Sequence, residues 1–326
     1  MEERNKDSQK KKYAGAICFI ILALVVITLI IMGINSKKPE PLQLGKLNTH
    51  VKGAAFIKAN EMLIKQISDN WLPNDLFWPT LLLDNMPNFQ IGELEVVRYN
   101  IRVLRDNLSR MRTTDKLDPS AEGAFTALSN DPYKWWFPSA ESKWAKAYDD
   151  MGKFYKGLMN GTSHFYPRAD NLVELLNQYV SLMGGVNTRL INAPKRREAV
   201  LAMEEDVKNG AKGSQLVQLN IPWHKIDDNF YYGQGVAYAL YESFKAIRID
   251  FSEVLKDKNS VKFVDKIIED LGRCHFEPLI VFNGAPGSVF ANHSLNLSGI
   301  FNDLINKFNR VLIFQHLNKI DSDCLE

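Results

Sequence analysis

A run of 21 residues without a charged side chain, Ala14–Ile34, constrains this chain more than any other feature. The run is long enough to cross the hydrocarbon core of a bilayer, because a spanning helix needs about 20 apolar residues. No second run of comparable length follows it, so the sequence predicts one membrane span. The alternative is a hydrophobic helix buried in a soluble core, which does not explain the lysines on both sides of the run.

The basic residues beside the run predict its orientation. Five precede it and two follow it: Arg4, Lys6, Lys10, Lys11, Lys12, Lys37 and Lys38. The side with more Lys and Arg remains in the cytoplasm, so we expect the C-terminal bulk to be translocated. A cleavable signal peptide has an apolar core of only about 7–15 residues and ends in an A-x-A-like site. This run is longer and has no such site, which favours an uncleaved signal anchor.

The sequence after the span is long enough for one large domain or two small ones that bury a real core. The formal net charge of the whole chain, +2, is close to neutral, and part of it belongs to the N-terminal tail, which argues against nucleic acid or another polyanion as the main partner of the domain. We expect these segments: basic tail 1–12, signal anchor 13–35, linker 36–50, helical domain 51–320 and C-terminal tail 321–326.

Apolar residues at alternating spacings of three and four predict a mainly α-helical domain, an antiparallel bundle with long aromatic and Pro-rich loops. Two seams are the clearest. Glu93–Arg112 repeats Leu94, Val97, Ile101, Leu104, Leu108 and Met111. Asp227–Val254 repeats Phe230, Gly233, Ala237, Leu240, Phe244, Ile247, Phe251 and Val254. In the second seam, Gly233 and Ala237 suggest a notch that lets another backbone approach closely.

Shorter helices are predicted from their end signals. Ser139 is the expected N-cap of a helix that stops at Asn160-Gly161, and Asp170 is the expected cap of Leu172–Met183, which ends at Gly184-Gly185. Two more are expected at Asn259–Leu271, with Ser260 as its cap, and at Leu295–Asn318. The last should bury Leu297, Phe301, Leu304, Phe308 and Val311. Between them, Pro194–Gly213 is charged and fits a solvated helix near a sub-domain joint at 185–220, or a long hairpin between helices.

Two stretches combine tryptophans with prolines, residues 71–92 and 131–142, and they contain Trp71, Trp78, Trp135 and Trp136. We expect the first to pack across the bundle as a structured loop, because aromatic side chains in a Pro-broken loop need burial. An exposed version would instead contact a membrane surface or a partner protein.

Arginines line one edge of the first seam: Arg98, Arg105 and Arg112. They fit an anionic-ligand stripe, or side chains that cover apolar surface and pair with a neighbouring helix. We favour the second interpretation and keep Arg98 and Arg105 as candidate binding residues beside the tryptophans.

Motifs for phosphate, nicotinamide, zinc or serine-hydrolase chemistry are absent, and we predict no cofactor and no metal. The best catalytic constellation joins His224, Asp227, Asp228 and His293, either as acid and base groups or as ligands that share a metal. A second pairs Glu141 with Asp170, as in a glycan-active enzyme. Helix capping explains these residues without catalysis, since each carboxylate or histidine stands where a helix begins.

The cysteines are Cys18 in the span, Cys274 and Cys324. In a translocated domain the last two either form a disulfide or remain separate thiols. Cys324 is the third residue from the end, where chains usually fray.

Five word-like stretches occur in order: LDNMPN (83–88), WWFPSAES (135–142), FYPRADNL (165–172), WHKIDDNFY (223–231) and ANHSL (291–295). In these stretches the chain resembles the bacterial family known as domain of unknown function 2333, over nearly its whole length. The resemblance implies a proteobacterial protein held in the inner membrane by one N-terminal helix, with a periplasmic domain. It implies no activity and no catalytic residues.

These observations predict a non-enzymatic accessory or scaffold protein of the cell envelope, anchored in the bilayer through residues 14–34. It would dock an envelope protein through its aromatic loops. The alternative is a periplasmic hydrolase acting on an envelope polymer, with Glu141, Asp170, Asp227, Asp228 and His293 as candidates. A third interpretation is a sensor that binds a small ligand near the Gly284–Ser288 turn.

Overall fold

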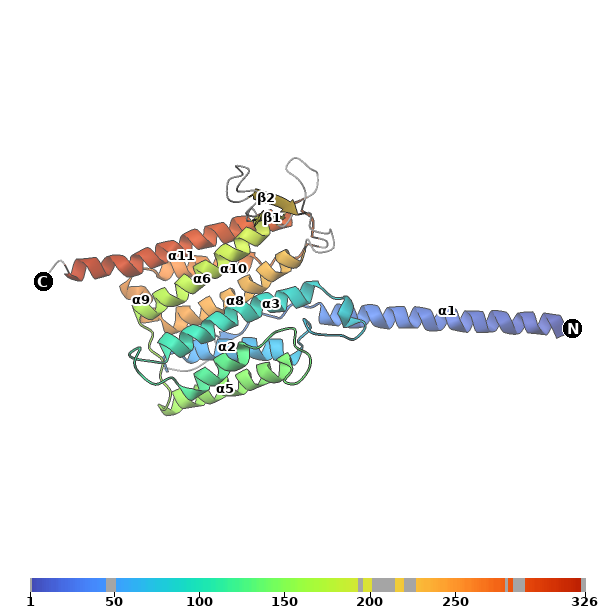
Figure 1. Cartoon of the computed structure of the whole chain (residues 1–326), viewed down its shortest axis with the longest axis horizontal. Coiled ribbons are helices and arrows are strands. Elements are labelled where there is room, and N and C mark those ends of the chain that lie inside the picture. Colours follow the sequence, from blue (N-terminus) through green and yellow to red (C-terminus); the bar gives the residue numbers. More distant parts are fainter. Residues whose placement is uncertain are drawn as a thin grey trace, which may run out of the picture.

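The computed structural model describes residues 2–44, 51–192, 196–200, 215–219, 227–278, 281–283 and 291–323. Within them the protein is mainly α-helical, as predicted, and one long N-terminal helix leads into a helical bundle (Figure 1). In chain order the α-helices are α1 Glu2–Asn35, α2 Ala54–Asp69, α3 Asn85–Val103, α4 Pro119–Leu128, α5 Ala140–Asn160, α6 Ala169–Asn192, α8 Asp228–Asp250, α9 Ser252–Asp257, α10 Val261–Arg273 and α11 His293–Asp323.

α1 projects away from the bundle (Figure 1). Its segment Tyr13–Asn35 is long and apolar enough to cross a membrane. Its aliphatic side chains are exposed, as at Leu22 and Leu29. A helix that is apolar on every side and remains uncovered by its own protein needs another apolar environment.

α8 is the central helix of the bundle. Its side chains are buried on nearly every side, and it packs against α2, α3, α6, α10 and α11. The predicted seam is buried from Phe230 to Phe251, and Val254 is half-buried. α8 runs in the same direction as α3, because Gly235 lies against Phe89 and Ser243 against Asn100.

The notch on α8 differs from the predicted one. A Cβ atom on Gly235 would overlap the carbonyl of Phe89, and one on Gly92 would overlap the carbonyl of Tyr232. At Gly233 the nearest atoms instead belong to flexible side chains, led by Leu297 at 3.2 Å. The close backbone approach therefore joins α3 and α8 through Gly92 and Gly235.

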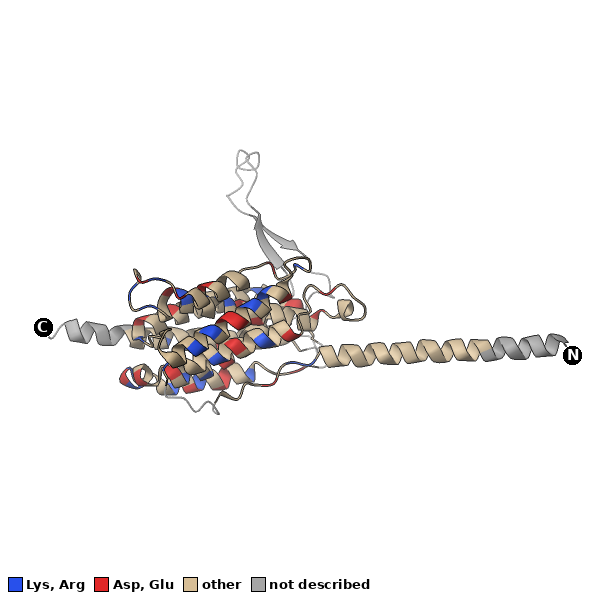
Figure 2. Ribbon diagram, turned by 90° about the horizontal axis from the view of Figure 1, so that it is seen from below, with Lys and Arg blue, Asp and Glu red and all other residues tan. Residues whose placement is uncertain are grey.

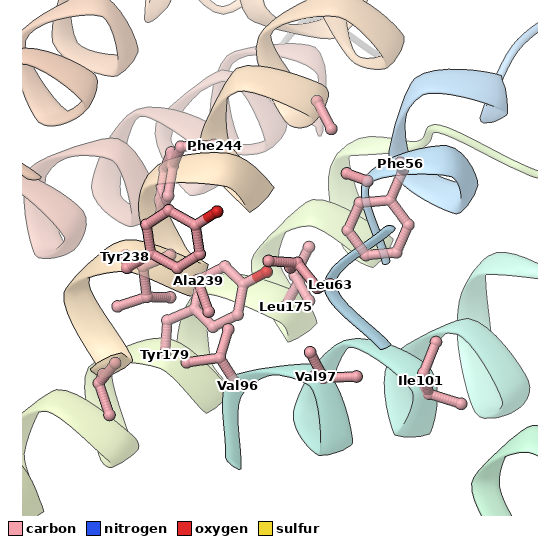
Figure 3. Close-up of a cluster of buried hydrophobic side chains, with 14 of the residues drawn as sticks. Phe56, Leu63, Val96, Val97, Ile101, Leu175, Tyr179, Tyr238, Ala239 and Phe244 are labelled. Carbon is pink, nitrogen blue, oxygen red and sulfur yellow. The ribbon is translucent and has the colours of Figure 1, made fainter. Parts of the chain in front are cut away.

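A buried polar network crosses the core where α2, α3, α6 and α8 meet. Asn100 donates to Asn60 Oδ1 and to Ser243 Oγ, both at 2.8 Å, and accepts from the Tyr179 hydroxyl at 2.5 Å. Tyr179 lies among apolar side chains that include Val96 and Leu175 (Figure 3). Every group in this network has a partner, which is the condition under which buried polar side chains favour one packing arrangement.

The end signals of α5 are confirmed. The Ser139 hydroxyl accepts from the Ser142 N–H at 3.3 Å, and Gly161 ends the helix with a left-handed φ of 75°. Apolar residues recur in this helix at spacings of four and three, and of these Trp144, Met151 and Leu158 are buried, whereas Tyr148 and Tyr155 are half-buried. Local chemistry is sufficient here, because caps and periodicity involve only near neighbours in the chain.

α6 is longer than predicted. It passes through Gly184 and Gly185 and ends at Asn192, because Val186 and Leu190 are buried on the same face and continue the seam. Packing therefore outweighs the low helix propensity of two glycines. Asp170 lies inside the first turn, so it is not the cap that the sequence suggests.

The seam of α3 ends earlier than expected. Leu94, Val97, Ile101, Leu104 and Leu108 are buried, whereas Met111 is 61% exposed. A π-helical turn at Leu104–Leu108 follows α3 and ends the regular 3.6-residue repeat before Met111 is reached.

Two short strands, β1 Arg196–Val200 and β2 Gln215–Leu219, pair antiparallel, with Arg196 opposite Leu219. The solvated helix expected over Pro194–Gly213 is therefore wrong for residues 196–200, and the hairpin alternative is the better description.

The remaining end signals are partly confirmed. Ser260 precedes α10, but its hydroxyl donates to the Leu255 carbonyl and makes no cap bond. α11 buries Leu297, Phe301, Leu304, Phe308 and Val311, as predicted.

The described part of the linker, residues 36–44, packs along α8. Tyr238 donates to the Glu40 carbonyl at 3.0 Å, Leu42 N–H donates to Glu242 Oε1 at 3.1 Å, and Lys245 Nζ donates to the Leu42 carbonyl at 2.7 Å. Leu42 is buried. The segment expected as a simple tether is therefore held against the central helix.

Candidate functional site

Trp71 is a core residue. It is 5% exposed, lies edge-to-face against Trp144 at 5.5 Å between ring centroids, and donates from its indole nitrogen to the Pro132 carbonyl at 2.9 Å. This part of the first Pro-rich stretch packs across the bundle, as expected.

The rest of that loop does not. Trp78 is 61% exposed and Phe77 is 79% exposed, so the expectation that the loop packs across the bundle is wrong for these two residues, and the exposed alternative describes them. The reason lies in the flanking structure. Trp71 and Leu72 fill the available core position, and α3 begins at Asn85, which leaves the intervening residues outside the bundle.

The second Pro-rich loop is also exposed. Trp135 and Trp136 are 56% and 64% exposed and lie edge-to-face, and the neighbouring Phe137 is 86% exposed. The two phenylalanines were not singled out from the sequence. The repeated pattern of aromatic residues before a proline, FWP at 77–79 and WFP at 136–138, is the signal that would have identified them.

Hydrogen bonds join the two loops at the end of the bundle nearer α1. Besides the Trp71–Pro132 bond, Asn74 donates to the Lys134 carbonyl at 3.2 Å. Asn70, at the end of α2, donates to Asn35 Oδ1 at the end of α1 at 3.2 Å. The 3₁₀ turn η2, Thr80–Leu82, contacts α1 directly. We call the exposed side chains of these loops the aromatic surface: Phe77, Trp78, Leu82, Trp135, Trp136 and Phe137.

Arg98 makes structural contacts. Its guanidinium donates to the Leu128 and Asn130 carbonyls at 2.8 and 2.6 Å, which ties α3 to the end of α4. It also lines a shallow open pocket together with Glu95, Tyr99, Arg102, Phe125 and Ser129.

Arg105 stacks over the ring of Phe125 at 3.7 Å and pairs with Asp106 at 2.7 Å and with Glu122 at 3.6 Å. The hydrogen bond that Arg105 donates to the Asp106 carboxylate raises the pKa of Arg105 above its usual value. Arg112 is exposed. In Arg98 and Arg105 the guanidinium groups satisfy carbonyls and carboxylates of the protein itself, as the pairing interpretation expects.

Three carboxylates gather where α3 and α8 begin. Asp84, Asp227 and Asp228 each place one oxygen within 4.8 Å of the other two, and Asn88 donates to Asp228 at 3.0 Å. His293 lies near the same end, 6.4 Å from the ring of Phe230, and its Nδ1 accepts from the Phe282 N–H at 2.9 Å.

The other candidates are placed elsewhere. Asp170 pairs with Arg168, and this hydrogen bond holds the pKa of Asp170 below its usual value. Arg168 reaches the Met111 carbonyl, beyond the far end of α3. Asn88 and Asn107, which mark the two ends, are 19 residues apart, or about 28 Å along a helix.

Glu141 lies in the first turn of α5, next to the second Pro-rich loop, so the predicted pair with Asp170 does not form. His224 and the Gly284–Ser288 turn lie outside the described residues.

Cys274 is buried, and its thiol donates to the Asp270 carbonyl at 3.5 Å. Burial raises the pKa of this thiol to about 12, which keeps it protonated. Cys324 lies outside the described residues, so the structure does not test the alternatives of a disulfide and two separate thiols.

The family comparison matches residues 8–310 to an uncharacterized protein family conserved in bacteria, domain of unknown function 2333. The chain belongs to this family. The match runs from the basic tail through the span and the bundle, which confirms the resemblance carried by the five sequence stretches. The description of the 2333 family assigns no activity. No curated protein and no solved structure matches the chain.

Proposed function

We propose that this protein is a single-pass protein of the bacterial inner membrane, whose helical domain stands in the periplasm as a non-enzymatic accessory or scaffold of the cell envelope. The observation that carries the proposal is α1. Its side chains from Tyr13 to Asn35 include no Lys, Arg, Asp or Glu, whereas the surface of the bundle mixes both signs of charge (Figure 2).

The bundle supports an accessory role. Of the five carboxylate and histidine candidates, Asp227, Asp228 and His293 lie near one end, while Asp170 lies near the other. The linker and η2 hold the end of α1 against the bundle, which suits a domain that must keep a set position relative to the membrane.

Two arginines in the span test the anchor. Leu22→Arg/Val25→Arg should remove the protein from the membrane fraction after alkaline extraction. Each Arg near the centre of a span costs about 2.5–3.5 kcal/mol of insertion free energy. The control variant, Ser36→Arg, places the charge just outside the span and should remain as membrane-bound as the wild-type protein. Persistent membrane association of the double variant would contradict the anchor.

A reporter enzyme that is active only in the periplasm, fused to the C-terminus, tests the compartment. We expect activity with the wild-type span. Activity of a cytoplasm-specific reporter instead would reverse the proposed orientation.

In-cell crosslinking tests the accessory role and should capture a defined envelope protein. If it captures none, Asp228→Asn and His293→Ala are the variants to assay for hydrolysis of envelope polymers.

A further inference from the structure

We infer that the aromatic surface inserts into the interface of the bilayer that α1 crosses, so that the domain docks on lipid at its membrane-proximal end. This inference rests on the proposed function. It assigns a partner of defined chemistry, the boundary between headgroups and acyl chains, to side chains that would otherwise be exposed to water.

The position of η2 carries the argument. One face of the last turns of α1 is covered: Thr28 is 9% exposed, and Ile31 and Met32 are half-buried. The same helix contacts η2. Figure 1 shows the segment before α3 extending to the end of α1. Thr28 lies seven residues before Asn35, or about 10 Å further along the helix axis. Since Tyr13–Asn35 is the span, a loop that packs on its last turns lies at the level of the interface.

The chemistry of the surface matches that location. Trp and other aromatic residues concentrate at the boundary between headgroups and hydrocarbon, where a ring is partly dry and its polar edge remains hydrated. Trp78 and Trp136 present rings from two loops that are hydrogen-bonded to each other and therefore move as one body.

Charge does not drive this contact. The two loops carry Asp75, Asp84 and Asp131 against one basic residue, Lys134. Asp75 accepts from Thr80 and Phe77, and Asp131 accepts from the Tyr133 N–H, so both are bonded locally. Anionic lipid should therefore not strengthen docking, and added salt should not weaken it. The covalent span keeps the loops at the membrane, so a weak apolar contact suffices.

Tryptophan emission of the full chain in phosphatidylcholine vesicles tests the inference. The starting chain for both measurements carries Trp223→Phe, so that every remaining tryptophan is one whose exposure the structure describes. The comparison chain adds Trp78→Phe/Trp135→Phe/Trp136→Phe and keeps only the buried Trp71 and Trp144. Lipid brominated near the glycerol should quench the tryptophan emission of the starting chain at least about twofold more than that of the comparison chain. Equal quenching of the two chains would overturn the inference.

A matched control places a new tryptophan at the other end of α5. Met159→Trp in the triple Phe variant adds an exposed ring about 30 Å along the helix from Ala140. It should remain unquenched, which shows that contact with lipid is limited to one end of the bundle. Quenching of this ring would mean that the domain lies on its side, and would overturn the inference.

Vesicle flotation separates this inference from the proposed anchor. Failure of the chain to float after alkaline washing would refute the anchor itself. A chain that floats with unquenched tryptophans would refute only the docking. If a photo-crosslinker at position 136 then captured one envelope protein in cells, the aromatic surface would be a protein-docking surface.

Discussion

Asp250 caps a helix that is distant from it in the sequence. It ends α8, yet its carboxylate accepts from the Phe56 N–H at 2.6 Å, at the start of α2. The N-cap residue of α2 is Gly53, which has no side chain to accept these N–H groups. Burial raises the pKa of Asp250 from 3.8 to about 6, although the bonded N–H groups act in the opposite direction.

Because the pKa of Asp250 is higher in the folded state, the protonated carboxyl group stabilises the fold. This contribution to the free energy of unfolding is fully present below pH 3.8 and is lost as pH rises through about 6. Asp250→Asn keeps an acceptor oxygen and removes the charge. We expect the stability of this variant relative to wild type to increase by up to about 3 kcal/mol between pH 4 and pH 7.5. Thermal unfolding of the detergent-solubilised chain measures the difference.

The stability of the variant must be compared with that of wild type at each pH, because His275 changes the stability of both chains in the opposite direction. Burial lowers the pKa of His275 to about 4, so it destabilises the fold as pH falls below its usual value of 6.5. This contribution is common to both chains and cancels. A constant difference between variant and wild type across the pH range would contradict the assignment to Asp250.

Among the elements, the α3–α8 pair sets the spacing of the bundle. Gly235→Ala would force the Ala methyl group into the Phe89 carbonyl, which is backbone and cannot rotate away. We expect a loss of about 3 kcal/mol, the upper part of the range for overpacked cores. Thermal unfolding of the detergent-solubilised full chain measures this loss of stability.

The control for that change is Gly184→Ala in α6, where no atom lies within 4 Å of the added methyl group. Alanine has the higher helix propensity, so this variant should gain roughly 0.5–1 kcal/mol. Equal shifts at the two glycines would show that helix propensity, and not the close approach, controls the result.

At the scale of the whole molecule, the linker connects α1 to the core. Leu42 N–H donates to Glu242, a fully buried carboxylate that also pairs with Lys245 at 2.9 Å. Glu242→Ala should speed hydrogen exchange in residues 38–44 by about 10–100-fold, because a hydrogen bond to a charged group contributes about 1.5–3 kcal/mol.

The matched change for this experiment is Glu253→Ala, which removes an exposed ion pair with Lys52 at 2.5 Å. Exposed pairs contribute at most about 1 kcal/mol, so exchange in the linker should not change. Unchanged exchange in the Glu242 variant as well would mean that apolar burial of Leu42 and Leu44 alone holds the segment.

The sequence by itself determined the long apolar segment of α1, the buried seams of α5, α8 and α11, and the ends of α5 at Ser139 and Gly161. These features depend on hydrophobic periodicity and on bonds between near neighbours, so the local pattern contains the information they need.

Only the tertiary structure decided which glycine lets two helices touch, why Trp71 is buried and Trp78 exposed, and how Asp250 caps α2. Each of these depends on residues far apart in the chain, which a local pattern does not specify. The same holds for the candidate site. The sequence places four tryptophans in the two Pro-rich stretches, but the fold alone separates one core ring from three exposed ones and places the first Pro-rich loop beside the end of α1.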